Sequence, residues 1–276
     1  MEIETPQQFV ALVLAADRTD HDPVTREAGT VCKAIATVAG RSMVLRVLDA
    51  LESSDAVGAI VLCGPPEPAL AACPELHRRI DGERVSWIMN LDSPCKSAEA
   101  GLAKLGGGAP VLVTTADHAL LSTEIVTQFA QESLLGSADA TVALVEHDYI
   151  SRAFPETHRT VIRMRDGRYC GCNLFTLLTE RGRSLVSFWR QVEQSRKHPW
   201  KMVAGILGAR AVLSYLFGAL TLERALAQIS KQLEMKLEAV VLPFAEAGID
   251  VDTPSDRLLV ERILEKRSDR CVLRPE

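Results

Sequence analysis

Short apolar runs rich in β-branched residues alternate with helical patterns along the first half of the chain, and this alternation constrains the fold more than any other feature. The runs that predict strands are Phe9–Leu14, Val57–Cys63, Val85–Met89, Val111–Thr115 and Thr141–Val145. The patterns that predict helices between them are Met43–Leu51, Ser97–Leu105 and Glu124–Leu135. Parallel strands joined by helices are buried on both faces, so their sequences are continuously apolar. The sequence therefore predicts an α/β fold, a three-layer, Rossmann-like arrangement around a mixed, mainly parallel sheet.

The pattern changes after residue 150. Two β-like runs, Thr160–Met164 and Tyr169–Phe175, flank the pair Asp166-Gly167, and an Asp-Gly pair in this position predicts a hairpin. Farther along, Leu177–Val192 predicts a long helix and Leu237–Leu242 predicts one more strand. We expect residues 1–276 to form a single α/β domain that is enlarged by a helical lobe.

Composition and charge exclude several classes of protein. The 276 residues are 47% hydrophobic, and 31 Lys+Arg against 36 Asp+Glu give a formal net charge of −5. The basic residues are scattered, so the chain lacks the positive stripe that nucleic-acid binding requires. The first ten residues do not resemble a secretory signal, and the seven cysteines contain no Cys-x-x-Cys spacing. We therefore expect a cytoplasmic protein with reduced, mostly buried cysteines.

One apolar stretch, Val203–Leu222, has about the length of a membrane span. Arg210 lies near its centre and glycines interrupt it, so the stretch favours a buried or half-buried helical pair over a span. A second interpretation stays open, in which this region lines a pocket for a lipid-like acceptor or makes a peripheral membrane contact.

Polar residues follow several of the predicted strands. In an open α/β sheet, ligands bind beyond the carboxyl ends of the strands. Leu14-Ala15-Ala16 ends the first strand and leads toward Arg26 and Lys33, Asp117 follows the strand Val111–Thr115, and Asp250-Val251-Asp252 precedes the last helix. These three clusters are the candidate functional residues.

The first cluster carries a family resemblance. Lys33 follows Arg26 by seven residues and begins the stretch KAIATVAGRSMVLRVLDAL, which ends at Leu51. With Leu14-Ala15-Ala16 before it, this region resembles the signature of MobA-like nucleotidyltransferases. In that family a strand ending Leu-Ala-Ala leads into a phosphate-binding loop, an arginine and a lysine.

Three later motifs resemble the same family in the same order. Ser93-Pro94 with Ser97 is similar to the family's segment that leads into a helix near the nucleotide. Thr115-Ala116-Asp117 is similar to the family's strand end that binds Mg²⁺, and Ile249–Pro254 is similar to its late metal motif. The resemblance implies the GT-A-like fold of nucleotide-diphospho-sugar transferases. It divides the domain into a nucleotide-binding part at about 8–145, an acceptor-side lobe at about 149–240, and a closing metal motif and helix at about 241–267.

The phosphate-binding loop departs from the family pattern. The stretch DRTDHDPVTR, residues 17–26, contains no glycine, and the next glycine is Gly29. Glycines let backbone N–H groups approach phosphates closely. Arg18 and Arg26 offer side-chain donors instead, but the three aspartates of the stretch repel an unmetallated triphosphate. Two interpretations remain: the loop carries an extra cation, or it moves away when the nucleotide binds.

The resemblance implies roles for individual residues. Lys33 and Arg26 are the expected catalytic residues, which neutralise the triphosphate and the leaving pyrophosphate. The expected nucleotide-binding residues are Leu14, Ala15, Ala16, Asp17, Arg18, Ser93 and Ser97. Mg²⁺ is expected at Asp117, Asp252 and Asp250, with Asp252 preferred over Asp250, and the acceptor at Gly171 and Asn173. The competing interpretations are purely structural: helix caps or turn residues for the aspartates, a solvated lysine for Lys33, and a bulge at Gly171.

The expected activity is Mg²⁺-dependent transfer of a nucleotide from a nucleoside triphosphate to a small, phosphorylated acceptor, with release of pyrophosphate. Two alternatives remain. One is a catalytically degenerate, nucleotide-binding regulatory or scaffold protein, which the missing glycines favour. The other is a nucleotide-sugar-dependent glycosyltransferase, against which the sequence Ala116-Asp117-His118 counts, since that class usually shows Asp-x-Asp. The sequence does not indicate the nucleobase, the acceptor or the oligomeric state.

Overall fold

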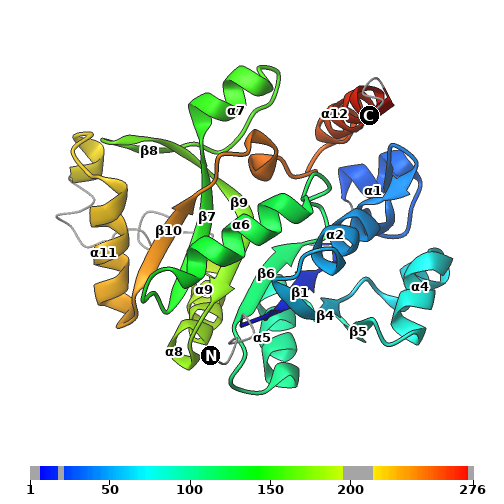
Figure 1. The fold of residues 1–276 in the computed structure, drawn as a ribbon, viewed down its shortest axis with the longest axis horizontal. Helices are drawn as coiled ribbons and strands as arrows, with labels where there is room; N and C mark the ends of the chain where they lie inside the picture. Colours follow the sequence, from blue (N-terminus) through cyan, green and yellow to red (C-terminus); the bar gives the residue numbers. More distant parts are fainter. Residues whose placement is uncertain (1–6, 18–21, 195–213, 273–276) are drawn as a thin grey trace, which may run out of the picture.

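The computed structural model describes residues 7–17, 22–194 and 214–272. In this part of the chain, an eight-stranded sheet has the order β10-β7-β9-β6-β1-β4-β5, and β8 pairs with β9 (Figure 1). The strands are β1 Phe9–Leu14, β4 Val57–Cys63, β5 Val85–Ile88, β6 Val111–Thr115, β7 Ala140–Glu146, β8 Ile162–Met164, β9 Gly167–Leu177 and β10 Leu237–Val241. A separate two-stranded hairpin consists of β2 Thr37–Val38 and β3 Arg41–Ser42.

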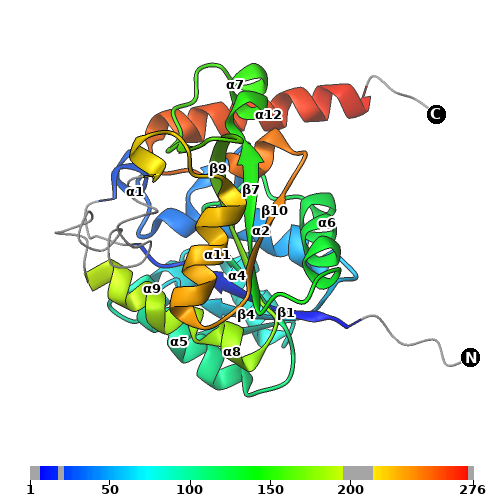
Figure 2. The ribbon, with the colours of Figure 1, turned by 90° about the vertical axis from the view of Figure 1, so that its left-hand side faces the viewer.

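Helices cover both faces of the sheet, which gives the three-layer α/β fold that the sequence predicts. Helices α2 and α6 pack on one face, while α5, α8 and α9 lie on the other (Figure 2). The helices are α1 Pro23–Ala28, α2 Met43–Glu52, α3 Glu67–Ala71, α4 Pro74–Asp81, α5 Pro94–Leu105, α6 Thr123–Leu134, α7 His147–Ala153, α8 Glu180–Arg183, α9 Leu185–Gln194, α11 Leu222–Leu233 and α12 Pro254–Val272. Two short 3-10 turns are η1 Lys33–Ile35 and η2 Ala245–Gly248.

The sheet is mixed because β9 runs against its neighbours. Strand β1 pairs in parallel with β4 and β6, and β7 pairs in parallel with β10. The predicted hairpin is present as β8 and β9, and β9 lies antiparallel between β6 and β7. The segment expected on the acceptor side thus supplies a strand in the middle of the sheet.

The predicted helix Leu177–Val192 is wrong at its start. Leu177 is the last residue of β9, where it pairs with Val111 of β6 and Ala140 of β7. Helix α8 begins only after Thr179, whose side chain accepts a hydrogen bond from the Gly182 amide and caps it. Leu177 fits a buried strand as well as a helix, so the apolar pattern alone places this boundary poorly.

The pairing of β9 opens the sheet at one end. Strand β6 pairs with β9 only as far as Val113–Phe175, and the β7–β9 register shifts between Val142 and Leu144. Near this irregularity Asn173 has a φ of +49°, a left-handed conformation that non-glycine residues adopt infrequently. The carboxyl end of β6 and the middle of β9 therefore separate, and this separation leaves room for a pocket.

The last helix is tied down at its first turn. The Asp256 amide donates to Thr253 Oγ1 at 3.2 Å, and Asp256 Oδ2 accepts from the Thr253 amide at 2.9 Å. This reciprocal pair is a capping box, which satisfies backbone donors at the helix start. It fixes where α12 begins, and hence where the preceding motif Asp250-Val251-Asp252 lies.

The thiol prediction agrees with the structure where side chains are described. The six cysteines whose side chains are described are all buried: Cys32, Cys63, Cys73, Cys95, Cys170 and Cys172. No helix among the described residues is both long and apolar enough to cross a membrane. Of the apolar stretch Val203–Leu222, residues 203–213 lie outside the described part.

Candidate active site

A pocket of about 310 Å³ lies beyond the carboxyl ends of β1 and β6. It is bounded by the segments after β1, β5 and β6, by β9 and α9, and by the segment before α12. Most residues predicted for the site line it: Leu14, Ala15, Ala16, Asp17, Lys33, Ser93, Ser97, Asp117, Asn173 and Asp252. The fold therefore brings together residues that are distant in the sequence, at the edge of the sheet where ligands of such folds bind.

Lys33 links two of the three aspartates that were expected to bind metal. Its Nζ lies 2.7 Å from Asp117 Oδ2 and 3.2 Å from Asp252 Oδ1. The Lys33 and Asp117 side chains are 13% and 11% exposed, whereas Asp252 is 55% exposed. Burial by itself would lower the pKa of Lys33, but the charges of Asp117 and Asp252 outweigh it and raise that pKa above its usual range. The ammonium group is therefore charged and held between two carboxylates.

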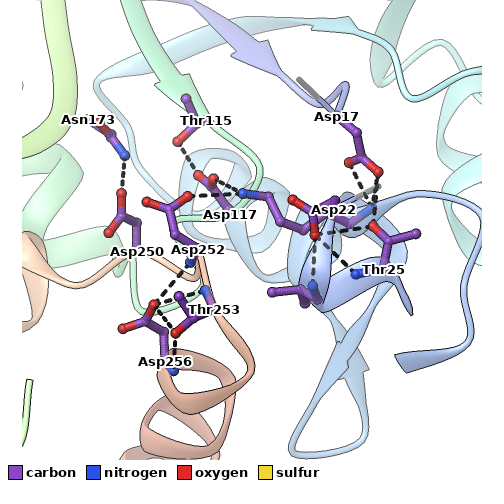
Figure 3. Close-up of polar contacts among 12 residues, drawn as sticks. Asp17, Asp22, Thr25, Thr115, Asp117, Asn173, Asp250, Asp252, Thr253 and Asp256 are labelled. Atoms are coloured by element: carbon purple, nitrogen blue, oxygen red, sulfur yellow. Dashed lines mark hydrogen bonds and ion pairs between the residues drawn. The ribbon is translucent and has the colours of Figure 1, made fainter. Parts of the chain in front are cut away.

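Asp117 is oriented by its own strand and by the late motif. Thr115 Oγ1 donates to Asp117 Oδ1 at 2.5 Å (Figure 3). The Val251 amide donates to the Asp117 carbonyl oxygen at 3.1 Å, which is a second contact. The second contact connects the end of β6 to the segment before α12. This connection explains how Asp252 reaches the Lys33 ammonium that Asp117 also contacts, although 135 residues separate the two aspartates in the chain.

Asp250 faces a different set of partners from Asp252. Its Oδ1 accepts from Arg159, and its Oδ2 accepts from Asn173 Nδ2 at 2.7 Å. Burial and the nearby charge of Asp117 raise the pKa of Asp250 to about 6. In a regular extended segment residues i and i+2 point to the same side, so regular geometry would turn both aspartates toward one ligand. Here Asp252 takes part in the Lys33 contact and Asp250 does not.

The carboxylates after β1 organise the loop itself. Asp17 accepts hydrogen bonds from the Lys33 amide at 2.9 and 3.1 Å and from Thr25 Oγ1 at 2.9 Å. Asp22 caps α1 by accepting from the Val24 and Thr25 amides. Both aspartates also line the pocket. Backbone amides in and after the described part of this loop therefore donate hydrogen bonds to the loop's own carboxylates, Asp17 and Asp22.

The remaining predicted residues differ in their placement. Ser93 caps α5, and Ser97 Oγ accepts from the Leu91 amide at 2.9 Å, so both serines line the pocket while holding its wall. Arg26 is exposed on α1 and Gly171 is exposed on β9, and neither is among the residues that line the pocket. Arg18 lies outside the described residues.

Residues on two sides of the site were not predicted from the sequence. Phe175, Trp189 and Leu91 form an apolar part of the pocket wall. An alternating strand and an amphipathic helix predict only that such residues are half-buried, which gives no indication of a ligand. Arg159 was missed because it lies in an irregular segment, and its partners Asp250 and Asp256 are 91 and 97 residues away.

Asp117 and Asp252 are the carboxylates of the pocket that could hold a divalent cation. They converge on one positive group, the Lys33 ammonium. Among the residues with described placement, no group of three or more His, Cys, Asp and Glu side chains is arranged as a metal cage. A Mg²⁺ ion at such a site would complete its coordination shell with waters and substrate phosphates.

Comparisons with known proteins identify the family and the fold of the chain. The MobA-like NTP transferase domain matches residues 11–229. A hypothetical transferase from Thermus thermophilus is 28% identical in sequence, and its structure matches 91% of this chain and 99% of its own with a TM-score of 0.74. No curated protein matches the chain.

Two further solved structures share the fold at low identity. The 4-diphosphocytidyl-2C-methyl-D-erythritol synthase from Anaerococcus prevotii is 13% identical, with 94% of this chain and 96% of that chain covered and a TM-score of 0.57. A CMP:2-keto-3-deoxy-manno-octonic acid synthetase complexed with CTP is 12% identical, with 94% and 100% covered and a TM-score of 0.58. Their likeness shows the fold, and the second of these structures contains bound CTP.

Proposed function

Because the chain belongs to the MobA-like NTP transferase domain family and is thus a nucleotidyltransferase, we propose that it transfers a nucleoside monophosphate from a nucleoside triphosphate to a small, phosphorylated acceptor. The reaction depends on Mg²⁺ and releases pyrophosphate. The observation that carries the proposal is the Lys33 ammonium held between Asp117 and Asp252 in a pocket at the carboxyl ends of the central strands.

Each residue of this group has a distinct task in the proposal. Asp117 and Asp252 would hold Mg²⁺, which supplies positive charge against the α-phosphate as negative charge develops there. Thr115 keeps the Asp117 carboxylate in its rotamer through a hydrogen bond of 2.5 Å. Lys33 pairs with phosphate oxygens and with the leaving pyrophosphate. Arg26 lies outside the pocket, so the charge neutralisation is assigned to Lys33.

The nucleoside is placed along the segment after β1 and beside the first turn of α5. Leu14, Ala15 and Ala16 line one side of the pocket, and Ser93 and Ser97 hold its wall at the start of α5. A nucleoside held against such a rigid edge is positioned with little loss of conformational freedom. This placement is supported by the lining residues.

The acceptor is placed on the side of β9 and α9. Asn173 and the apolar pair Phe175 and Trp189 line the pocket there. The apolar surface supports an acceptor with a hydrophobic portion, and a phosphate on that acceptor provides an oxygen that is already ionised. With such a nucleophile no general base is required, and catalysis consists of positioning and charge neutralisation.

The test is pyrophosphate release from each of ATP, CTP, GTP and UTP with Mg²⁺ and a pool of cellular phosphorylated metabolites. We expect release with one nucleotide and its loss in Asp117→Ala. Asp148→Ala is the matched control, because Asp148 is an exposed aspartate on α7 that pairs with Arg168, away from the pocket. Absence of release with all four nucleotides, or equal release by Asp117→Ala, refutes the proposed function.

A further inference from the structure

Asn173 is held in the pocket by an unusual backbone and by one carboxylate. Its φ of +49° is left-handed, a region in which asparagine is more common than most residues. Its Nδ2 donates to Asp250 Oδ2 at 2.7 Å (Figure 3). The side chain lines the pocket, and among the described residues no other hydrogen bond to this amide is present. The amide is therefore anchored through its nitrogen.

Asp250 is in turn fixed by Arg159. The guanidinium donates to Asp250 Oδ1, to the Asp250 carbonyl oxygen at 2.6 Å and to Asp256 Oδ1 at 3.1 Å. The Arg159 side chain is only 10% exposed. It lies between α7 and β8, so it connects this segment to the motif before α12 and to the first turn of that helix. Arg159 thus locks the carboxylate on which Asn173 depends.

The hydrogen-bonding chemistry of Arg159 and Asp250 determines which end of the Asn173 side-chain amide, NH₂ or oxygen, faces Asp250. A guanidinium has donors only, so the Asp250 oxygen that faces it must accept. An ionised carboxylate also accepts at its other oxygen, and the Asn173 group that meets it must therefore be the NH₂. The Asn173 amide oxygen is left for a ligand in the pocket.

We propose that Arg159 and Asp250 are positioning residues that fix the Asn173 amide with its oxygen presented to the substrate. The substrate group that meets Asn173 is then a hydrogen-bond donor, a hydroxyl or amine, and not a phosphate oxygen. This inference rests on the proposed function for the identity of the pocket as a substrate site. It separates the two aspartates of the late motif: Asp252 faces the Lys33 cation, and Asp250 orients Asn173.

The first experiment observes the Asn173 amide directly. The chain contains two asparagines, Asn90 and Asn173, so ¹⁵N-asparagine labelling gives two side-chain NH₂ pairs in the NMR spectrum. Asn173→Asp assigns them by removing one pair. In the unaltered protein we expect the Asn173 pair to be shifted downfield and to exchange with water more slowly than that of Asn90, whose amide makes one long contact of 3.5 Å to the Leu91 carbonyl oxygen.

Loss of Arg159 must release this amide. In Arg159→Met we expect the Asn173 pair to move toward the Asn90 position and its exchange to accelerate at least about tenfold, as for a lost charge-assisted hydrogen bond. The isosteric Asp250→Asn keeps the fold testable if Arg159→Met does not fold. An Asn173 pair that stays unchanged in both variants overturns the proposal.

The second experiment exchanges amide and carboxylate. In Asp250→Asn, Arg159 still requires an oxygen, so the introduced amide turns its NH₂ toward Asn173 and reverses that side chain. The substrate's donor group then faces the Asn173 NH₂, which is also a donor. We expect the concentration of the metabolite pool that gives half-maximal pyrophosphate release to rise at least about tenfold, while the maximal rate changes less. The double variant Asp250→Asn/Asn173→Asp again presents an oxygen to the pocket, and we expect it to return to within about threefold of the unaltered protein.

The outcomes distinguish the two hypotheses. If the unaltered protein releases no pyrophosphate, the proposed function fails, and the amide spectra still decide whether Arg159 and Asp250 fix Asn173. If release occurs and the double variant is no better than Asp250→Asn alone, the assigned polarity of Asn173 is wrong. A loss of maximal rate with an unchanged half-saturating pool also contradicts a positioning role toward the substrate.

Discussion

Lys33→Met removes the cation that the structure places between two carboxylates. Removing one partner of a buried ion pair costs about 3–5 kcal/mol, because the remaining charge is left uncompensated. Lys33 and Asp117 are 13% and 11% exposed, but Asp252 is 55% exposed and stays hydrated. We therefore expect the lower end, a loss of about 3 kcal/mol in the free energy of unfolding. For a domain of this size that lowers Tm by roughly 6–12 °C.

Divalent cations distinguish this loss from ordinary destabilisation. Without Lys33, Asp117 and Asp252 are free to hold Mg²⁺ in the absence of nucleotide, and a ligand present at roughly 100 times its Kd stabilises the folded state by about 2.7 kcal/mol. Thermal unfolding with and without Mg²⁺ is the assay, and Mn²⁺ binding by EPR measures the affinity independently. We expect Lys33→Met to bind Mn²⁺ more tightly than the unaltered protein and to regain stability with Mg²⁺.

The matched control for this prediction is Lys96→Met. Lys96 pairs with Asp92 at 2.8 Å, and both side chains are well exposed, 46% and 73%. Exposed pairs contribute about 0–1 kcal/mol, so little change and no dependence on Mg²⁺ are expected. The reasoning is refuted if Lys33→Met is as stable as Lys96→Met, or if Mg²⁺ stabilises Lys33→Met no more than the unaltered protein.

Three further predictions follow from single contacts and from the charge of the pocket. Thr115→Val removes the hydrogen bond to Asp117 and should lower pyrophosphate release about 10- to 100-fold, whereas Thr114→Val, which removes a buried hydroxyl without a partner among the described residues, should leave it unchanged. Burial lowers the pKa of His118 to about 4, below its usual value near 6.5, so the stability from this neutral side chain is complete above pH ~6.5 and lost as pH falls toward 4. Urea unfolding at pH 7 and pH 5 should show that the free energy of unfolding changes less with pH in His118→Leu than in the unaltered protein. An equal change in both proteins would contradict this. In EDTA, no nucleoside triphosphate should raise Tm, because Lys33 alone faces five carboxylates among the described lining residues; a metal-free shift equal to that with Mg²⁺ would contradict this.

The central parallel strands of the sheet were predictable because most of their residues are buried. Phe9–Leu14 and Val57–Cys63 are continuous apolar runs, and the structure has strands with these same bounds. The end of β9 was not predictable in this way. Its last residue Leu177 pairs with strands that lie 66 and 37 residues earlier in the chain, and no local pattern contains that information.

The candidate site likewise contains residues that the sequence predicts and residues that it does not. Residues at strand ends, such as Asp117, were found because the fold class fixes where strands end and where ligands bind. The different surroundings of Asp250 and Asp252 depend on Arg159, which reaches the motif from an irregular segment. Side-chain partners of this kind follow from the packing of distant segments, so spacing in the sequence does not reveal them.

The glycine-poor loop after β1 is the reason why we expect nucleotide binding in this pocket to require cations. In glycine-rich phosphate loops, backbone N–H groups point at the phosphates. Here the Lys33 amide donates to Asp17, and the Val24 and Thr25 amides donate to Asp22. These donors are already satisfied within the protein, so the described part of the loop adds negative charge to the pocket and does not offer these amides to a phosphate. Under the proposed function, a triphosphate is then neutralised by Lys33 and by metal ions held at Asp117 and Asp252. On this view the aspartates of the loop make nucleotide binding conditional on the metal, which is a different basis for phosphate recognition within the same fold.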